Sequence, residues 1–149
     1  MPREHSSIVM SSDELTHFAS AEKRCVIGTL DAMGAPWGDV VACAFYDGRL
    51  YFRVPAATRT LRNIQHDDRV CCAIESNPEG SDYYTIKGAT FHGRAQPADA
   101  AAASRLEEAL GQQPDPVTGA TAGEGAIFSV GVDDVVSFDF AKIKRRFEQ

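Results

Sequence analysis

The stretch VVACAFYDGRLYFRV, residues 40–54, decides the fold expected of this chain. Two runs of mainly apolar residues flank the pair Asp47-Gly48. Such a pair is a strong signal for a two-residue β-hairpin turn, because both central residues of that turn take a positive φ. Residues 40–46 and 49–54 are therefore expected to form two antiparallel strands.

A two-residue loop also fixes which side chains share a face of the hairpin. One face is wholly apolar and is expected to lie in the core, with the cross-strand pairs Phe45/Leu50, Cys43/Phe52 and Val41/Val54. The other face combines small, tyrosine and arginine side chains in the pairs Ala42/Arg53, Ala44/Tyr51 and Tyr46/Arg49. Two interpretations stay open for this second face: a flat ligand or a partner subunit over the alanines, or a covering helix.

The rest of the chain is predicted to form short strands and three helices. Ser11 and Glu14 fit a capping box for a helix ending near residue 22, Thr58 caps a helix ending near residue 65, and Asp99 caps a helix ending near residue 110. Further strands are expected at residues 25–30, 69–75, 83–96, 126–132 and 135–140. Gly88 and Gly93 indicate bulges or sharp coiling in the long strand, and residues 114–125 are expected to form a loop. This pattern indicates an all-β barrel, with residues 1–10 as an N-terminal arm and residues 11–149 as a single domain.

Composition excludes several classes of function. The chain has 149 residues, a net charge of −6 and a pI of about 5.1, so it is expected to bind neither nucleic acid nor an anionic membrane. No apolar stretch approaches the length of a membrane span and no signal peptide is evident, which predicts a cytoplasmic protein. The four cysteines show no CxxC spacing and the four histidines are scattered, so we expect buried thiols and no metal site.

One polar cluster points to a ligand. Residues 58–63 (TRTLRN) follow a strand and open a helix, where unpaired backbone N–H groups and the helix dipole favour an anion. The hydroxyls of Thr58 and Thr60 and the guanidinium of Arg59 suit a phosphate, and Arg53 is placed to converge on the same point. The alternative is an N-cap threonine followed by solvated arginines.

Taken in order, these segments resemble the FMN-binding split barrels, the group similar to pyridoxamine 5′-phosphate oxidase. The resemblance covers residues 15–140 and rests on the capped helix, the hairpins at residues 25–36 and 45–52, the TRT cluster with Asp68-Arg69-Val70, and the later strands. It implies a six-stranded antiparallel split β-barrel of the Greek-key type. It also implies a homodimer with the flavin in a groove between the subunits.

The resemblance carries particular residues into the cofactor site. Thr58 and Arg59 match the phosphate-binding element, whereas Thr60 stands where lysine is common. Arg53 borders the phosphate end. The backbone segment that meets the flavin ring corresponds to Val40, Val41, Ala42 and Cys43. The single tryptophan, Trp37, precedes this segment and is expected to contact a ring system, the dimer partner or the core.

The implied activity is hydride transfer between flavin N5 and a small-molecule substrate. The cofactor carries this chemistry, so no catalytic side chain is predicted. Two alternatives use the same barrel: a reductase dependent on the deazaflavin coenzyme F-420, and a non-catalytic protein that binds flavin or heme. His66 and His92 are the candidate axial ligands for heme.

Overall fold

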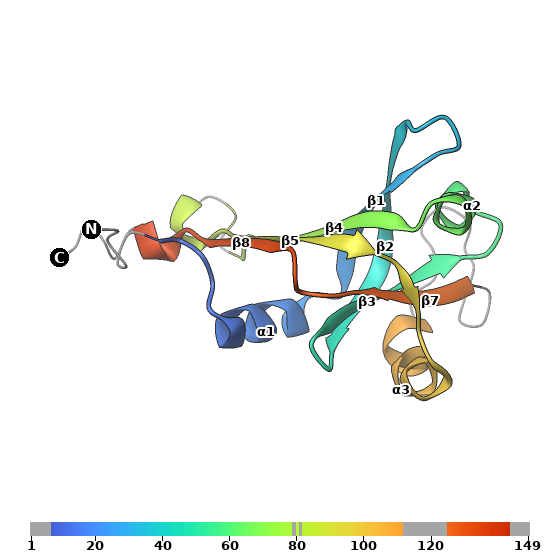
Figure 1. The fold of residues 1–149 in the computed structure, drawn as a ribbon. Helices are drawn as coiled ribbons and strands as arrows, with labels where there is room; N and C mark the ends of the chain where they lie inside the picture. Colours follow the sequence, from blue (N-terminus) through green and yellow to red (C-terminus); the bar gives the residue numbers. More distant parts are fainter. Residues whose placement is uncertain (1–6, 79, 81, 112–124, 144–149) are drawn as a thin grey trace.

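The computed structural model describes residues 7–78, 80, 82–111 and 125–143 of the chain (Figure 1). The helices are α1 (Ser12–Ala21), α2 (Arg59–His66) and α3 (Ala100–Gly111), with a short 3-10 turn, η2 (Tyr83–Thr85). The strands are β1 (Arg24–Leu30), β2 (Pro36–Tyr46), β3 (Arg49–Pro55), β4 (Arg69–Ser76), β5 (Lys87–Arg94), β6 (Gln96–Pro97), β7 (Gly125–Val130) and β8 (Val135–Asp139). This mainly β architecture confirms the predicted fold class, although the described residues form eight strands and the resemblance implied six.

Local sequence signals produce the turns and helix starts that were predicted. Asp47 and Gly48 have φ values of 50° and 72°, as their hairpin turn requires. Ser11 and Glu14 form the capping box of α1, and the Thr58 side chain accepts a hydrogen bond from the Leu61 N–H at the start of α2. Asp99 caps α3 by accepting the Ala102 N–H at 2.8 Å.

All eight strands form one curled sheet in the order β6-β7-β3-β2-β1-β4-β5-β8, with every adjacent pair antiparallel. Strand β2 changes its partner along its length. It pairs with β1 from Pro36 to Ala42 and with β3 from Cys43 to Tyr46. The predicted pairs Val41/Val54 and Ala42/Arg53 are therefore wrong, because β3 has already diverged from β2 where Val41 and Ala42 pair with β1.

The two faces of the β2–β3 hairpin pack against different parts of the protein. The apolar face lies in the main core, which includes Val41, Cys43, Leu50, Phe52 and Val54. The second face lies under α3: Tyr51 is buried with three α3 side chains, and Ala42, Ala44 and Tyr46 pack against this cluster. Of the two interpretations left open, the covering helix is correct (Figure 1).

The predicted strand over residues 83–96 divides into η2, β5 and the first residue of β6. Residues 83–85 form η2, and β5 then runs from Lys87 to Arg94 in unbroken register with β4, so neither Gly88 nor Gly93 forms a bulge in that pairing. Gly88 is needed for close packing instead, because a Cβ there would lie 2.3 Å from Cζ of Phe138. The predicted loop 114–125 lies outside the described residues except for Gly125, which begins β7.

The described end of the N-terminal arm is attached to strand β8. The Asp139 N–H donates to the Ile8 carbonyl, and the Met10 N–H donates to the Ser137 hydroxyl. Met10 is part of the main core. In the part of the chain that the structure describes, no helix is long and apolar enough to cross a membrane.

Candidate functional site

The first feature of the site is a strand edge. In the described residues, β2 pairs from Pro36 to Ala42 with β1 only, because β3 leaves β2 beyond Phe52 and runs on to α2. The opposite edge of this part of β2 therefore has no strand beside it in the described chain. Such an edge presents backbone N–H and C=O groups to a ligand.

The N-terminus of α2 is fastened to this same part of β2. The Thr60 hydroxyl donates a 3.1 Å hydrogen bond to Oδ2 of Asp39, and Thr60 is fully buried. Next to it, the Arg59 guanidinium lies 4.2 Å from the centroid of the Trp37 ring. The structure thus brings the predicted phosphate cluster against the strand that was predicted to meet the ring.

The hydroxyl of Thr58 makes its hydrogen bonds within the chain, at the start of α2. It donates to the Pro55 carbonyl at 2.8 Å and accepts from the Leu61 N–H at 3.2 Å. The Thr60 proton is likewise engaged by Asp39. The groups left for an anion at this point are the first backbone N–H groups of α2 and the exposed Arg59 side chain.

The other predicted residues occupy three different environments. Val40 is 43% exposed on the outer face of the sheet, whereas Val41 and Cys43 are buried in the core. Ala42 is half-buried against the α3 cluster. Arg53 is buried on β3 and has interaction partners of its own.

An apolar row crosses the outer face of the sheet. Successive register pairs join five side chains from β2, β1, β4, β5 and β8: Val40, Val26, Ala73, Thr90 and Val136. Directly paired residues share one face of a sheet, so these side chains form a line. Its three valines, at positions 26, 40 and 136, are 49%, 43% and 59% exposed.

The neighbouring row on that face begins with two glycines. Gly38 pairs with Gly28, and Gly28 pairs with Cys71. A Cβ at Gly38 would meet no atom within 4 Å, whereas one at Gly28 would lie 2.7 Å from the Cys71 thiol. The apolar row therefore stands beside two positions without side chains, of which Gly38 is open and Gly28 is covered by the Cys71 thiol.

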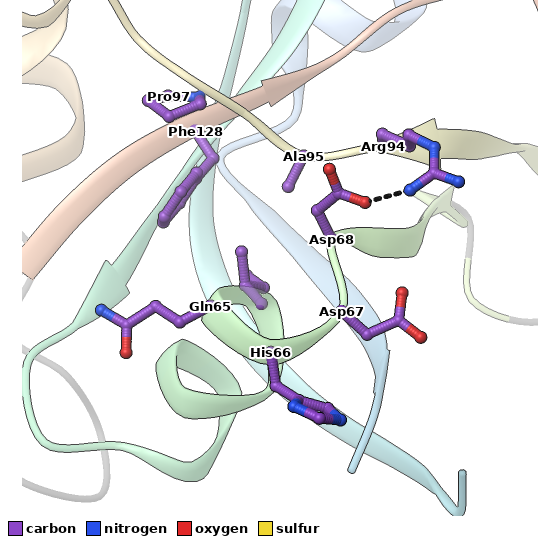
Figure 2. Close-up of a pocket in the computed structure, with 9 residues that line it drawn as sticks. Gln65, His66, Asp67, Asp68, Arg94, Ala95, Pro97 and Phe128 are labelled. Atoms are coloured by element: carbon purple, nitrogen blue, oxygen red, sulfur yellow. Dashed lines mark hydrogen bonds and ion pairs between the residues drawn. The ribbon is translucent and has the colours of Figure 1, made fainter. Parts of the chain in front are cut away.

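A separate cavity of about 580 Å³ lies at the other end of α2 (Figure 2). Ile64, Ala95 and Phe128 provide its apolar lining, and Gln65, His66, Asp67, Asp68, Arg94 and Pro97 complete it. Both carboxylates already have cationic partners: Arg69 bonds to Asp67 and lowers the pKa of that carboxyl to about 2, and Arg94 pairs with Asp68. Among the described residues that line this cavity, Asp67, Asp68 and Arg94 are therefore all engaged in ion pairs.

A second cavity, of about 610 Å³, lies between α1, β2 and α3 and reaches Cys43. Hydrogen bonding with Cys25 and burial raise the pKa of the Cys43 thiol, so it is not a thiolate nucleophile. Cys25 and Cys72 are also buried, as predicted, but Cys71 is exposed on the outer face. Among the described residues, no group of three or more histidine, cysteine or acidic side chains is arranged to hold a metal ion.

The two candidate heme ligands lie on different elements. His66 ends α2 at the first cavity, and His92 lies on the outer face of β5, where its Nδ1 is 3.3 Å from the Asp134 carbonyl. Sequence reasoning missed Asp39 and gave Trp37 no specific partner. Asp39 stands within an apolar strand, which was the available signal for a polar partner.

The curled antiparallel sheet, split where β2 changes partners and carrying a capped helix at the split, defines a split-barrel protein. The family model described as pyridoxamine 5′-phosphate oxidase matches residues 11–135, so the chain belongs to that family. No curated protein matches the sequence significantly.

Solved structures share the fold at low sequence identity. A conserved hypothetical protein from Mycobacterium tuberculosis superposes with a TM-score of 0.75 at 20% identity, covering 95% of this chain and 92% of the other. An FAD-binding protein from Mycobacterium smegmatis gives a TM-score of 0.64 at 12% identity, with coverages of 89% and 98%. A heme-binding protein from the same organism gives 0.64 at 17% identity, with coverages of 91% and 61%.

Proposed function

We propose that this protein is a flavin-dependent oxidoreductase that binds FMN in a groove at a homodimer interface and acts on a small-molecule substrate. The observation that carries the proposal is the attachment of the α2 N-terminus to the unpaired edge of β2 through Thr60 and Asp39. This attachment sets an anion-binding helix end beside an open strand edge. Membership of the pyridoxamine 5′-phosphate oxidase family and the FAD-binding structural relative support a flavin cofactor.

The phosphate end of FMN belongs at the start of α2. Arg59 supplies charge and directed N–H donors there, and the backbone N–H groups of residues 59 and 60 add the favourable end of the helix dipole. Thr58 contributes by capping the helix and fixing its direction. Thr60 acts through its backbone, because its hydroxyl is bonded to Asp39, and Arg53 adds a buried positive charge from β3.

The ring of FMN belongs along β2 near Val40, where the outer face is open and the edge is unpaired. Val41 and Ala42 contribute through their backbone, since Val41 points into the core and Ala42 lies against α3. Cys43 lies just beyond the unpaired edge, because it pairs with Phe52 of β3 and its N–H donates to the Lys23 carbonyl. When bound, FMN supplies the hydride acceptor and donor. The chain contributes binding, orientation and exclusion of water.

The dimer is proposed to form through the outer face of the sheet. The exposed valines of this row give an apolar surface that a two-fold axis can place against the same surface of a second copy. Val40 stands at one end of this row and also at the proposed ring site. A second subunit on this face would therefore close the flavin groove.

The test is to purify the protein, record its visible spectrum, and titrate it with FMN and with coenzyme F-420 by fluorescence. Tight FMN binding, with the flavin fluorescence altered, is the expected result, and a substrate screen then follows. Preferential binding of coenzyme F-420 would show that the cofactor is the deazaflavin and not FMN. A folded dimer that binds neither would overturn the proposal, and a heme titration would then test the remaining alternative through His66→Ala and His92→Ala.

A further inference from the structure

The Trp37 ring and the Arg59 guanidinium form a cation–π pair that links β2 to α2. The guanidinium carbon lies 4.2 Å from the ring centroid. Trp37 is 38% exposed, so its ring lies at the surface beside the unpaired part of β2. It is also the only tryptophan of the chain.

Few other contacts hold the Arg59 side chain. No hydrogen bond or ion pair of its guanidinium occurs within the described parts of the chain, and the nearby Asp39 carboxylate is bonded to Thr60 and to the Val40 N–H. Among the described residues, the Trp37 ring is thus the contact that holds the Arg59 guanidinium. An arginine without it would sample many rotamers at the helix end.

Stacking leaves the arginine able to bind. A guanidinium is planar and its five N–H donors lie in that plane, so one face can rest on an aromatic ring while the edge donates to a phosphate. The stack therefore holds the cation at the helix end without occupying its donors. Holding a ligand-binding side chain in place before binding lowers the entropy lost on binding.

We propose that Trp37 is a positioning residue that holds Arg59 for the phosphate group of the flavin. This inference rests on the proposed function, since Arg59 is placed there at the phosphate end of FMN. It assigns to Trp37 a role in selecting phosphorylated flavin. The ring does not itself contact the flavin in this assignment.

The experiment compares FMN with riboflavin, which lacks the phosphate, as ligands of the full-length protein. The variants are Trp37→Leu, Trp37→Phe, Arg59→Ala and the double variant Trp37→Leu/Arg59→Ala. Met33→Ala, at an exposed turn position, is the matched control. Thermal unfolding checks that each variant is folded, and the emission of Trp37 in the wild type and in Arg59→Ala reports the stack in solution.

We expect Trp37→Leu to weaken FMN binding about two- to fivefold, the range of an exposed cation–π pair, and to leave riboflavin binding unchanged. Trp37→Phe should retain most of the affinity, and the loss should vanish in the Arg59→Ala background. The Trp37 emission should change in Arg59→Ala.

Three results would overturn the positioning role while leaving the proposed function intact. They are equal losses for FMN and riboflavin, a Trp37→Leu effect that persists without Arg59, and unchanged emission in Arg59→Ala. A wild-type protein that binds neither flavin would overturn the proposed function and the positioning role together.

Discussion

The Thr60 hydroxyl donates a hydrogen bond of 3.1 Å to Oδ2 of Asp39, and this bond joins the first turn of α2 to the middle of β2. The two residues are 21 positions apart in the sequence, and Thr60 is fully buried. Removing the donor leaves a carboxylate without its side-chain partner, so Thr60→Val should lower the free energy of unfolding by about 1–3 kcal/mol. Denaturant unfolding measures this change. Thr60→Ser, which keeps the hydroxyl, is the control, and equal loss in both variants would contradict the role of the bond.

Arg59 is expected to dominate the affinity for the phosphate end of FMN. Arg59→Ala removes a charge-assisted hydrogen bond, so the dissociation constant for FMN should rise by roughly ten- to hundredfold. Fluorescence titration at two salt concentrations checks this, because the wild-type affinity should fall more steeply with salt than that of the variant. Unchanged affinity would place the phosphate elsewhere.

The outer face of the sheet is expected to be the dimer interface. Val26 is 49% exposed and lies next to Val40 in the apolar row, so Val26→Glu would bury an unpaired carboxylate in the dimer and should yield a monomer. Light scattering coupled to gel filtration gives the mass, and titration of the same sample should show loss of FMN binding. Met33→Glu, a charge added away from this face, should stay dimeric. A Val26→Glu monomer with full FMN affinity would refute a site between subunits.

Gly88 is expected to be required for packing between β5 and β8. A Cβ would lie 2.3 Å from Cζ of Phe138 and 3.2 Å from the Ile74 carbonyl oxygen. Gly88→Ala should therefore cost about 1–3 kcal/mol of stability, measured by denaturant unfolding. The double variant Gly88→Ala/Phe138→Leu should lose less than the sum of the two single variants, since the smaller side chain vacates the space. Strict additivity would show that the contact with Phe138 is not the cause.

The ion pair between Glu14 and Lys142 is expected to make stability depend on pH under acidic conditions. The hydrogen bond from Lys142, together with the Ser11 N–H, lowers the pKa of Glu14 from 4.5 to about 2. A lowered carboxyl pKa adds stability that is complete above pH 4.5 and is lost as the pH falls through about 2. The pair is partly exposed, so its contribution at pH 7 is about 0.5–1 kcal/mol.

Chemical unfolding midpoints measured from pH 7 down to pH 2 check this dependence. Glu14→Gln should be less stable than the wild type at neutral pH and should lose less stability on acidification. Parallel curves for the two proteins would show that Glu14 does not contribute to the acid dependence.

The sequence by itself determined the local structure. The Asp47-Gly48 turn, the capping box at Ser11 and the N-caps at Thr58 and Asp99 all form as predicted. Each depends on the conformational preference or the hydrogen bonding of residues within four positions of one another, so a short stretch contains all the information. The apolar face of the central hairpin followed from the same turn, because the alternation of side chains leaves one choice of core.

Tertiary structure decided how these pieces meet. From the sequence, the face with Ala42 and Ala44 could be covered by a ligand, a partner subunit or a helix, and in the structure α3 covers it. The bond from Thr60 to Asp39 joins residues 21 positions apart, and the stack of Arg59 on Trp37 joins two other distant positions. The point where β2 changes its partner is likewise a property of the assembled sheet. Such contacts form only once the strands have packed together. The packing that buries the most apolar surface depends on all the strands at once, so no single stretch of sequence predicts it.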